Sequence, residues 1–457
     1  MKTSPALGVL FTLPWILPAF ASEPVPTTTT AEESAGLDAR EEGGIAPSES
    51  ATSAHPLGWL SDPGAAPKDP IEALVTGKIH LDNRLRLELA DTTGRDSSTA
   101  ITNRIRLGYE TKAYHGFSAM IAFDNVSTPD GDNYFVPPTG DGTPSRTVIA
   151  DPAGTRLNEV YGRFRTDSLA DTGVGLEVRG GRQRIKLDDD RFIGNVGWRQ
   201  FEELFDAVSV RTDLGNDRLS VFYAYAWQVQ RIFGPDGPNP DFDSHLINVS
   251  YKVAPEITVV PFAYLLDFRG DEPQNSSNNL GLRLTGTLWQ DADDASDLYA
   301  DYELTYAHQW DAGSNPVNYD AEFVAAQVRA HRKGVGFLLA GFQFLGSDNG
   351  NFAFRFPLGT NHKFQGFADN FLVTPNAGLQ DLHFGVGADL PWGIKGVATV
   401  HKFWTDEGGD DLGEEYDFVA VKKITPNWSV LTKGAFYDGD SGQPDTTRFW
   451  LETTVHF

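Results

Sequence analysis

The chain has 457 residues, no cysteine and a formal net charge of -26. The lack of cysteine excludes a disulfide framework, a thiolate metal site, a cysteine nucleophile and a lipid-modified amino-terminal cysteine. The acidic balance argues against a nucleic-acid-binding protein, because a phosphate backbone requires a basic surface. With 46 glycines, 30 phenylalanines, 14 tyrosines and 10 tryptophans, the composition favours β-structure over a helical bundle.

The first 21 residues have the pattern of a secretory signal peptide. Lys2 precedes an apolar stretch over residues 6–17, and residues 19–21 have the small-x-small form of a cleavage site. We therefore expect export by a cleaved signal peptide and a mature chain that begins near Ser22. The alternative is a retained membrane anchor, but the apolar stretch is short and two prolines interrupt it.

Residues 22–70 form a Ser/Thr/Pro/Glu-rich segment. It contains nine acidic residues against two bases, Arg40 and Lys68, and almost no large apolar side chains. Such a segment cannot bury a core, so we predict a disordered periplasmic region. Residues 71–457 change in character and are assigned to one outer-membrane β-barrel.

The barrel assignment rests on apolar and polar residues that alternate in segments of roughly ten. Residues 446–457 show the pattern most clearly. Their apolar face is Phe449, Leu451, Thr453, Val455 and Phe457, and their polar face is Arg448, Trp450, Glu452, Thr454 and His456. One face suits lipid and the other suits water.

The same pattern predicts eighteen strands, although sixteen would also fit. They are expected near residues 77–90, 99–112, 116–126, 156–166, 173–182, 204–212, 218–228, 244–252, 256–268, 279–288, 297–309, 319–330, 334–344, 380–388, 394–404, 415–423, 428–437 and 446–457. Long connections after odd strands, such as 127–155, 183–203 and 345–379, alternate with short turns after even strands. The turn 289–296 fits this scheme least well.

These features indicate an all-β, transmembrane, antiparallel up-and-down barrel. No segment after the signal approaches the roughly 18 to 20 apolar residues of a spanning helix. Closure is needed in lipid because each unpaired backbone group costs several kcal/mol there. A secreted β-sandwich or solenoid is the alternative, but it would not explain one-sided apolar faces with aromatic ends on so many segments.

Two stretches carry a resemblance to a known family. They are residues 181–185 (GRQRI) with 188–200 (DDDRFIGNVGWRQ), and residues 362–369 (HKFQGFAD) with 378–382 (GLQDL). Over most of residues 77–457 the chain resembles the alginate-export family of outer-membrane proteins, whose characterised exporter is an eighteen-stranded barrel that passes an anionic polyuronate. The resemblance implies a barrel and a pore more firmly than alginate as the cargo, and residues 22–70 have no counterpart in it.

A pore for anions needs fixed positive charge, and arginine binds carboxylates bidentately without losing its proton. Nine arginines on or next to the water-facing positions of the first five predicted strands are therefore the predicted substrate-binding residues of the lumen. They are Arg84, Arg86, Arg104, Arg106, Arg163, Arg165, Arg179, Arg182 and Arg184. Acids on the same faces leave open the alternative that these arginines only brace the wall.

No catalytic residue, metal site or cofactor is predicted, because no nucleophile elbow, zinc His-x-x-x-His pair, phosphate loop or dinucleotide fingerprint occurs. The three aspartates 188–190 lack the ligand spacing of a calcium loop and are interpreted as a solvated acidic loop. A surface Ser-His dyad stays open on spacing alone.

The predicted function is an outer-membrane porin or exporter for anionic polysaccharide or small carboxylates. The alternative is an adhesin or receptor that binds through its outer loops. The expected partners are outer-membrane lipid and lipopolysaccharide, and the barrel assembly machinery through Phe457, with no nucleic acid. The direction of loop 345–379 separates the two functions, since an inward loop would narrow a channel and an outward loop would offer a binding surface.

Overall fold

The computed structural model describes residues 66–129, 131–215, 218–270, 272–290 and 298–457. The predicted signal peptide and most of the predicted segment 22–70 lie outside these ranges. Within them, nearly all regular structure is β-strand, and a short helix, α1 (Pro70–Val75), precedes the first strand with Asp69 as its N-cap. Among the described residues, none of the helices combines the length and apolar character needed to cross a membrane.

The strands of the barrel wall are β1 (Lys78–Thr92), β2 (Ser98–Glu110), β3 (Phe117–Ser127), β6 (Gly154–Thr166), β7 (Gly175–Gln183), β8 (Leu204–Leu214), β9 (Leu219–Gln230), β10 (Asp241–Ala254), β11 (Ile257–Leu266), β12 (Phe268–Arg269), β13 (Ser277–Gln290), β14 (Leu298–Asp311), β15 (Asp320–Arg332), β16 (Gly336–Leu345), β19 (Leu379–Leu390), β20 (Ile394–Trp404), β21 (Asp411–Thr425), β22 (Trp428–Gly439) and β23 (Thr446–His456). The connections contain β4 (Phe135–Val136), β5 (Asp141–Gly142), β17 (Ser347–Asp348), β18 (Phe352–Ala353), η1 (Gly131–Asn133), η2 (Leu169–Asp171), η3 (Pro273–Asn275), η4 (Asn361–Lys363) and η5 (Pro391–Gly393).

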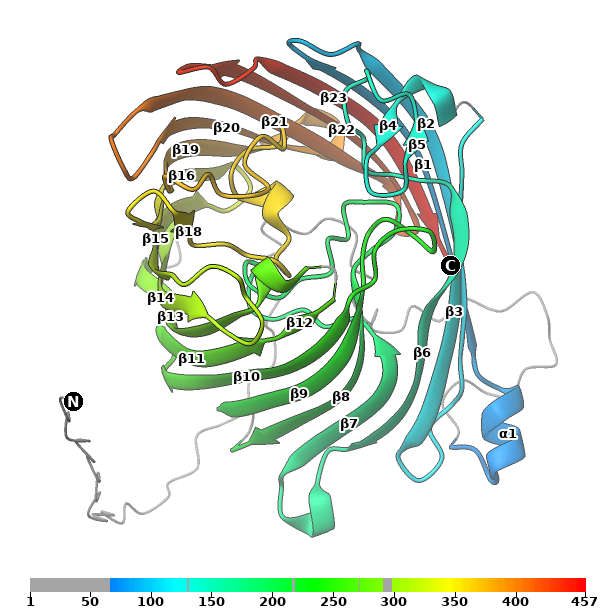
Figure 1. Ribbon diagram of the computed structural model, residues 1–457. Coiled ribbons are helices and arrows are strands. Elements are labelled where there is room, and N and C mark those ends of the chain that lie inside the picture. Colours follow the sequence, from blue (N-terminus) through cyan, green and yellow to red (C-terminus); the bar gives the residue numbers. More distant parts are fainter. Residues whose placement is uncertain (1–65, 130, 216–217, 271, 291–297) are drawn as a thin grey trace, which may run out of the picture. The chain divides into compact units, whose positions relative to one another are not determined.

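In the described part of the chain, the wall is a closed antiparallel barrel of eighteen strands (Figure 1). Each strand pairs with its neighbours along the chain, and β12 extends the line of β11 along β10. The barrel closes where β1 pairs with β23, with Leu87 opposite Leu451 and Arg86 opposite Glu452. Closure leaves no open sheet edge, as a lipid environment requires.

The two faces of each strand separate apolar from polar side chains. On β1, Leu85 is 45 % exposed on the outside, whereas the neighbouring Arg86 is 1 % exposed on the inside. On β23, Leu451 is 46 % exposed and the neighbouring Trp450 is fully buried. This two-residue period is the pattern of a transmembrane barrel with an apolar belt around a polar interior.

The structure confirms the eighteen predicted strands, with ends that shift by a few residues. It also confirms the alternation of connections, because long segments follow β3, β7, β9 and β16 and short turns follow β2, β10, β15 and β21. Most of the predicted turn 289–296 lies outside the described residues. Below, the end of the barrel with the long connections is called the long-loop end, and the opposite end is called the short-turn end.

Candidate functional site

Two long connections fold into the barrel interior instead of projecting from it. They are the β7–β8 loop, residues 184–203, and the β16–β19 loop, residues 346–378, and both lie within the ring of strands (Figure 1). Many of their side chains are almost fully buried, including Ile193, Phe201, Phe354 and Leu358 at 0 % exposure. The second loop therefore has the inward direction that distinguishes a channel from an outward binding surface.

The two inward loops are joined to each other at three levels. Ile193 and Leu358 form a parallel bridge, and the guanidinium of Arg191 donates to Gln365 Oε1 at 2.7 Å. Arg199 forms a 2.6 Å ion pair with Asp369. The joint thus combines backbone, polar and charged contacts, and the loops occupy the interior as one unit.

The tip of the β16–β19 loop is fastened to the barrel wall by carboxylates. The backbone N–H of Ala368 donates to Glu415 at 2.6 Å, and that of Phe367 donates to Asp417 at 3.0 Å. Gly366 allows this approach, because a Cβ at this position of φ 79° would lie 2.3 Å from Glu415. These two hydrogen bonds to backbone amides fasten the tip of the loop to β21.

A buried relay of three hydrogen-bonded side chains lies behind this tip. Lys433 Nζ is 2.8 Å from His362 Nε2, and His362 Nδ1 is 2.6 Å from Asp369. Burial, opposed by Asp369, lowers the pKa of His362 to about 3. His362 is therefore neutral, with Nδ1–H donating to Asp369 and Nε2 accepting from Lys433. Together with Arg199, the relay ties both loops to the wall.

The predicted arginines on β1 support the β7–β8 loop. Arg84 donates to the carbonyl of Gly197 at 2.9 Å, and Arg86 donates to that of Trp198 at 2.5 Å. Arg86 also forms ion pairs with Glu452 at 2.6 Å and Asp151 at 3.3 Å, and its guanidinium stacks 3.9 Å from the Trp198 ring. These two side chains hold the loop against the inner wall.

The next four predicted arginines form ion pairs with acids beneath and within the same loop, and together these pairs are the arginine network. Arg106 lies 2.6 Å from Asp124 and 2.9 Å from Glu202, and Arg184 lies 2.5 Å from Glu202. Arg104 pairs with Asp82, and Arg182 pairs with Asp206 at 2.7 Å. Despite burial, the nearby arginines hold the pKa of Glu202 well below its ordinary value, so this loop carboxylate is charged.

The remaining three predicted arginines lie apart from this network, on the half of β6 and β7 towards the short-turn end. Arg163 pairs with Glu110 at 2.7 Å and Arg179 pairs with Glu177 at 2.8 Å. The Arg165 side chain is 62 % exposed and lies 3.5 Å from Asp167. All nine predicted arginines therefore have a carboxylate neighbour, and their role in substrate binding stays a prediction.

Open space remains between the inward loops and the wall formed by β13 to β20. One cavity has a volume of about 460 Å³ and is lined by Arg283, Arg329, Asp301, Glu303 and two of the aspartates 188–190, among others. A second cavity is lined by Arg329, Lys363, His383 and the rings of Phe337 and Phe364. Gln327 and Arg329 line both cavities, so the cavities are neighbours.

The acidic stretch 188–190 lies inside the barrel, which corrects its expected place in an outer loop, although Asp188 is still exposed where it lines a cavity. Asp190 is 6 % exposed and lies 3.3 Å from Lys363, and Asp188 lies 4.0 Å from Arg283. Burial raises the pKa of Asp188 to about 6, the nearby aspartates add to the increase, and Arg283 opposes it. The reason for the difference is tertiary, because the loop folds inward.

Sequence reasoning missed the cations that line the cavities. Arg283 and Arg329 occupy inward positions of β13 and β15, and Lys363 belongs to η4 of the inward loop. The strand period could have identified the two arginines, because it also assigns them to the water-facing side. The position of Lys363 follows only from the path of its loop.

Comparison of the fold with solved structures identifies its architecture. OccAB2 of Acinetobacter baumannii superposes with a TM-score of 0.64 at 14 % identity, covering 84 % of this chain and 98 % of that one. OccK9 (OpdG) of Pseudomonas aeruginosa gives 0.63 at 12 % identity, covering 84 % and 100 %. OpdK of Pseudomonas aeruginosa, solved with vanillate, gives 0.60 at 13 % identity, covering 83 % and 98 %.

The chain has the fold of the outer-membrane porins. The sequence matches no protein-family model and no curated protein. The likeness to the Occ and Opd structures therefore concerns architecture, and the resemblance to the alginate-export family has no support beyond the stretches that suggested it.

Proposed function

We propose that the protein is an outer-membrane channel for small anionic solutes, with carboxylates as the main class. The observation that carries the proposal is the pair of loops folded inside a closed barrel, which reduces the lumen to cavities lined by Arg283, Arg329 and Lys363. A narrowed lumen brings fixed charges close to a passing solute, where water and salt screen them least.

The cavity next to Arg329 and Lys363 has the chemistry to hold an aromatic carboxylate. The two cations can pair with the carboxylate, and the rings of Phe337, Phe364 and Phe367 offer flat apolar surface beside them. OpdK, whose fold is similar, was solved with vanillate, which is an aromatic carboxylate. This agreement supports a small carboxylate over a neutral sugar.

Some of the nine arginines predicted from the sequence contribute to the proposed function by positioning a loop that narrows the lumen. Each is paired with a carboxylate, so its charge is largely offset, but those of β1 and β2 position the loop that narrows the lumen. We propose that they act on selectivity mainly through the shape of the pore. The cavity cations also have carboxylate neighbours, such as Glu303 for Arg283 and Asp190 for Lys363, and we propose that they attract anions directly because they line open space.

Two alternatives expected from the sequence have weaker support. An alginate-like polyuronate is the cargo implied by the family resemblance, but no family model supports it. An adhesin or receptor would display its long loops outwards, whereas the β16–β19 loop packs against the inner wall through Glu415 and Asp417.

Reversal potentials in planar bilayers test the proposed channel. Across a potassium chloride gradient the wild type should show anion preference, and the double variant Arg329→Gln/Lys363→Gln should lose much of it. Arg269→Gln is the matched control, because this side chain is 60 % exposed and pairs with Asp243 away from the cavities. An unchanged reversal potential in the folded double variant would contradict the assigned role of the cavity cations.

Solute block distinguishes the candidate cargoes. Vanillate should reduce the current more than its neutral alcohol does, and short uronate oligomers should reduce it less than vanillate. Stronger block by the oligomers would favour the polyuronate alternative. A complete lack of conductance in a folded barrel would instead favour the adhesin or receptor.

A further inference from the structure

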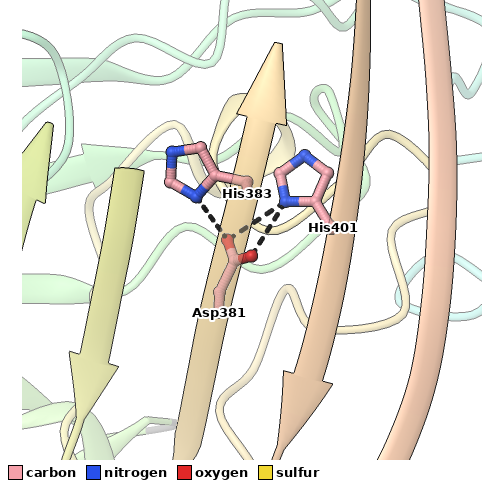
Figure 2. A group of neighbouring side chains, drawn as sticks. All are labelled: Asp381, His383 and His401. Carbon is pink, nitrogen blue, oxygen red and sulfur yellow. Dashed lines mark hydrogen bonds and ion pairs between the residues drawn. The ribbon is translucent and has the colours of Figure 1, made fainter. Parts of the chain in front are cut away.

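Three potential metal ligands converge on the inner wall. Asp381 and His383 are two residues apart on β19 and therefore share its inward face, and His401 lies opposite His383 on β20 (Figure 2). Their ligand atoms all lie within 4.8 Å of one another, and among the described residues this is the cluster whose composition suits a metal ion. All three side chains are buried, at 0 %, 4 % and 6 % exposure.

One potential metal-ligating nitrogen of this cluster has no hydrogen-bond partner. His401 Nδ1 lies 3.0 Å from Asp381, but His383 Nδ1 lies 3.5 Å from the same carboxylate and makes no hydrogen bond. Both imidazoles turn their Nδ1 atoms toward the Asp381 oxygens (Figure 2). A buried nitrogen without a hydrogen bond is costly, and a bound cation would satisfy it.

Neighbouring residues set the orientation of both rings. Gly341 of β16 lies opposite His383, and a Cβ there would come within 2.2 Å of His383 Nε2, so the glycine provides the space for this ring. The His401 ring stacks on Phe403, and its Nε2 lies 3.8 Å from Asp417. A carboxylate behind a ligating histidine is the usual outer-shell partner of a metal site.

We propose that Asp381, His383 and His401 bind a divalent transition-metal ion of the zinc class in the lumen. One carboxylate oxygen and two imidazole nitrogens suit zinc, copper or nickel better than calcium or magnesium, which prefer oxygen ligands. Tetrahedral zinc at bond lengths of about 2.1 Å places its ligand atoms about 3.4 Å apart. From Asp381 Oδ2, the Nδ1 atoms of His401 and His383 lie 3.1 and 3.5 Å away, so these separations need little adjustment.

The site lies beside the lumen. His383 and His401 line the cavity that is also lined by Arg329 and Lys363, so a metal held by these histidines would lie next to this cavity. Each histidine binds through Nδ1 as neutral imidazole with its proton on Nε2, and any proton on Nδ1 leaves to water. A bound dication would increase the positive charge of the cavity.

Isothermal titration of the tag-free, refolded barrel with zinc chloride tests the site independently of transport. One equivalent should bind, and His383→Gln and His401→Gln should each weaken binding by at least about 100-fold. His383→Gln is the primary variant because the Nδ1 atom that it removes makes no hydrogen bond in the native protein. Asp417→Asn should weaken binding by about 10- to 100-fold, as expected for an outer-shell partner.

His331→Gln is the matched control. His331 is also buried and lies 2.6 Å from Asp301, but it is not part of the three-ligand cluster. Cobalt(II) provides a second readout, because visible absorption bands of a four-coordinate ion should form with the wild type and disappear in His383→Gln. Absence of saturable zinc binding, or wild-type binding and bands in folded His383→Gln, would overturn the proposal.

Discussion

Replacing Arg86 by glutamine should destabilise the barrel more than replacing any exposed arginine. Arg86 lies on the inner face of β1, where it pairs with Glu452 and Asp151 and supports the β7–β8 loop through the carbonyl and ring of Trp198. The side chains of Glu452 and Asp151 are only 9 % and 1 % exposed, so neither can be hydrated when the guanidinium is removed.

The magnitude follows from these contacts. Removing one partner of a buried ion pair costs about 3–5 kcal/mol, because the other charge stays buried without compensation. Glu452 keeps Arg84 at 3.4 Å, which favours the lower half of that range. Loss of the stacking on Trp198 adds about 1 kcal/mol. We expect a loss of about 4 kcal/mol, which corresponds to almost a 1000-fold change in the unfolding equilibrium.

Urea titration of the refolded protein in detergent micelles measures this loss, with gel mobility before and after boiling as the index of the folded barrel. Arg165→Gln is the control, because its 62 % exposed side chain in a single surface pair should contribute less than about 1 kcal/mol. The double variant Arg86→Gln/Glu452→Gln should recover part of the loss, since the carboxylate no longer stays buried as a charge. Equal stabilities of Arg86→Gln and Arg165→Gln would refute the reasoning.

Three further outcomes are expected. Because the pKa of Asp188 is raised to about 6, this carboxyl loses its proton between about pH 5 and 7, so anion preference should fall as the pH rises through this window and fall less in Asp188→Asn, as measured by reversal potential. Equal pH dependence of the two proteins would exclude this carboxyl as a source. Deleting Phe457, which is 69 % exposed at the end of β23, should reduce the amount of barrel in outer-membrane fractions, and equal amounts would argue against recognition of this residue by the assembly machinery. The mature protein should require detergent for solubility and show β-type circular dichroism with heat-dependent gel mobility, whereas a water-soluble monomer would contradict a transmembrane barrel.

The barrel itself was predictable because its signal is local. In a strand the side chains alternate between faces, so Leu85 and Arg86 are assigned to lipid and lumen by their order alone. The same rule predicted all eighteen strands. The alternation of long and short connections predicted that the long connections lie at one end of the barrel and the short turns at the other. Strand ends were less predictable, because a strand continues as far as its neighbour offers backbone partners.

The candidate site depended on contacts that no local pattern records. The β16–β19 loop folds inward because Glu415 and Asp417 of β21 bind its backbone amides, about 50 residues along the chain. Inward folding moved the acidic stretch 188–190 from the expected solvated loop to the wall of a cavity. From the sequence, the β16–β19 loop could fold into the barrel or project from it, and no local pattern decides between these two paths.

The sequence by itself therefore determined the up-and-down barrel and the face on which each side chain lies, and it favoured eighteen strands over sixteen. The export signal expected at residues 1–21 stays a prediction. The tertiary structure decided which side chains meet: Arg86 pairs with Glu452, 366 residues away, and His383 meets His401 across the register of β19 and β20. The physical reason is that the two-residue period is a property of each strand alone. Strand register, loop docking and the cavities between them depend on packing among residues that are distant in the chain.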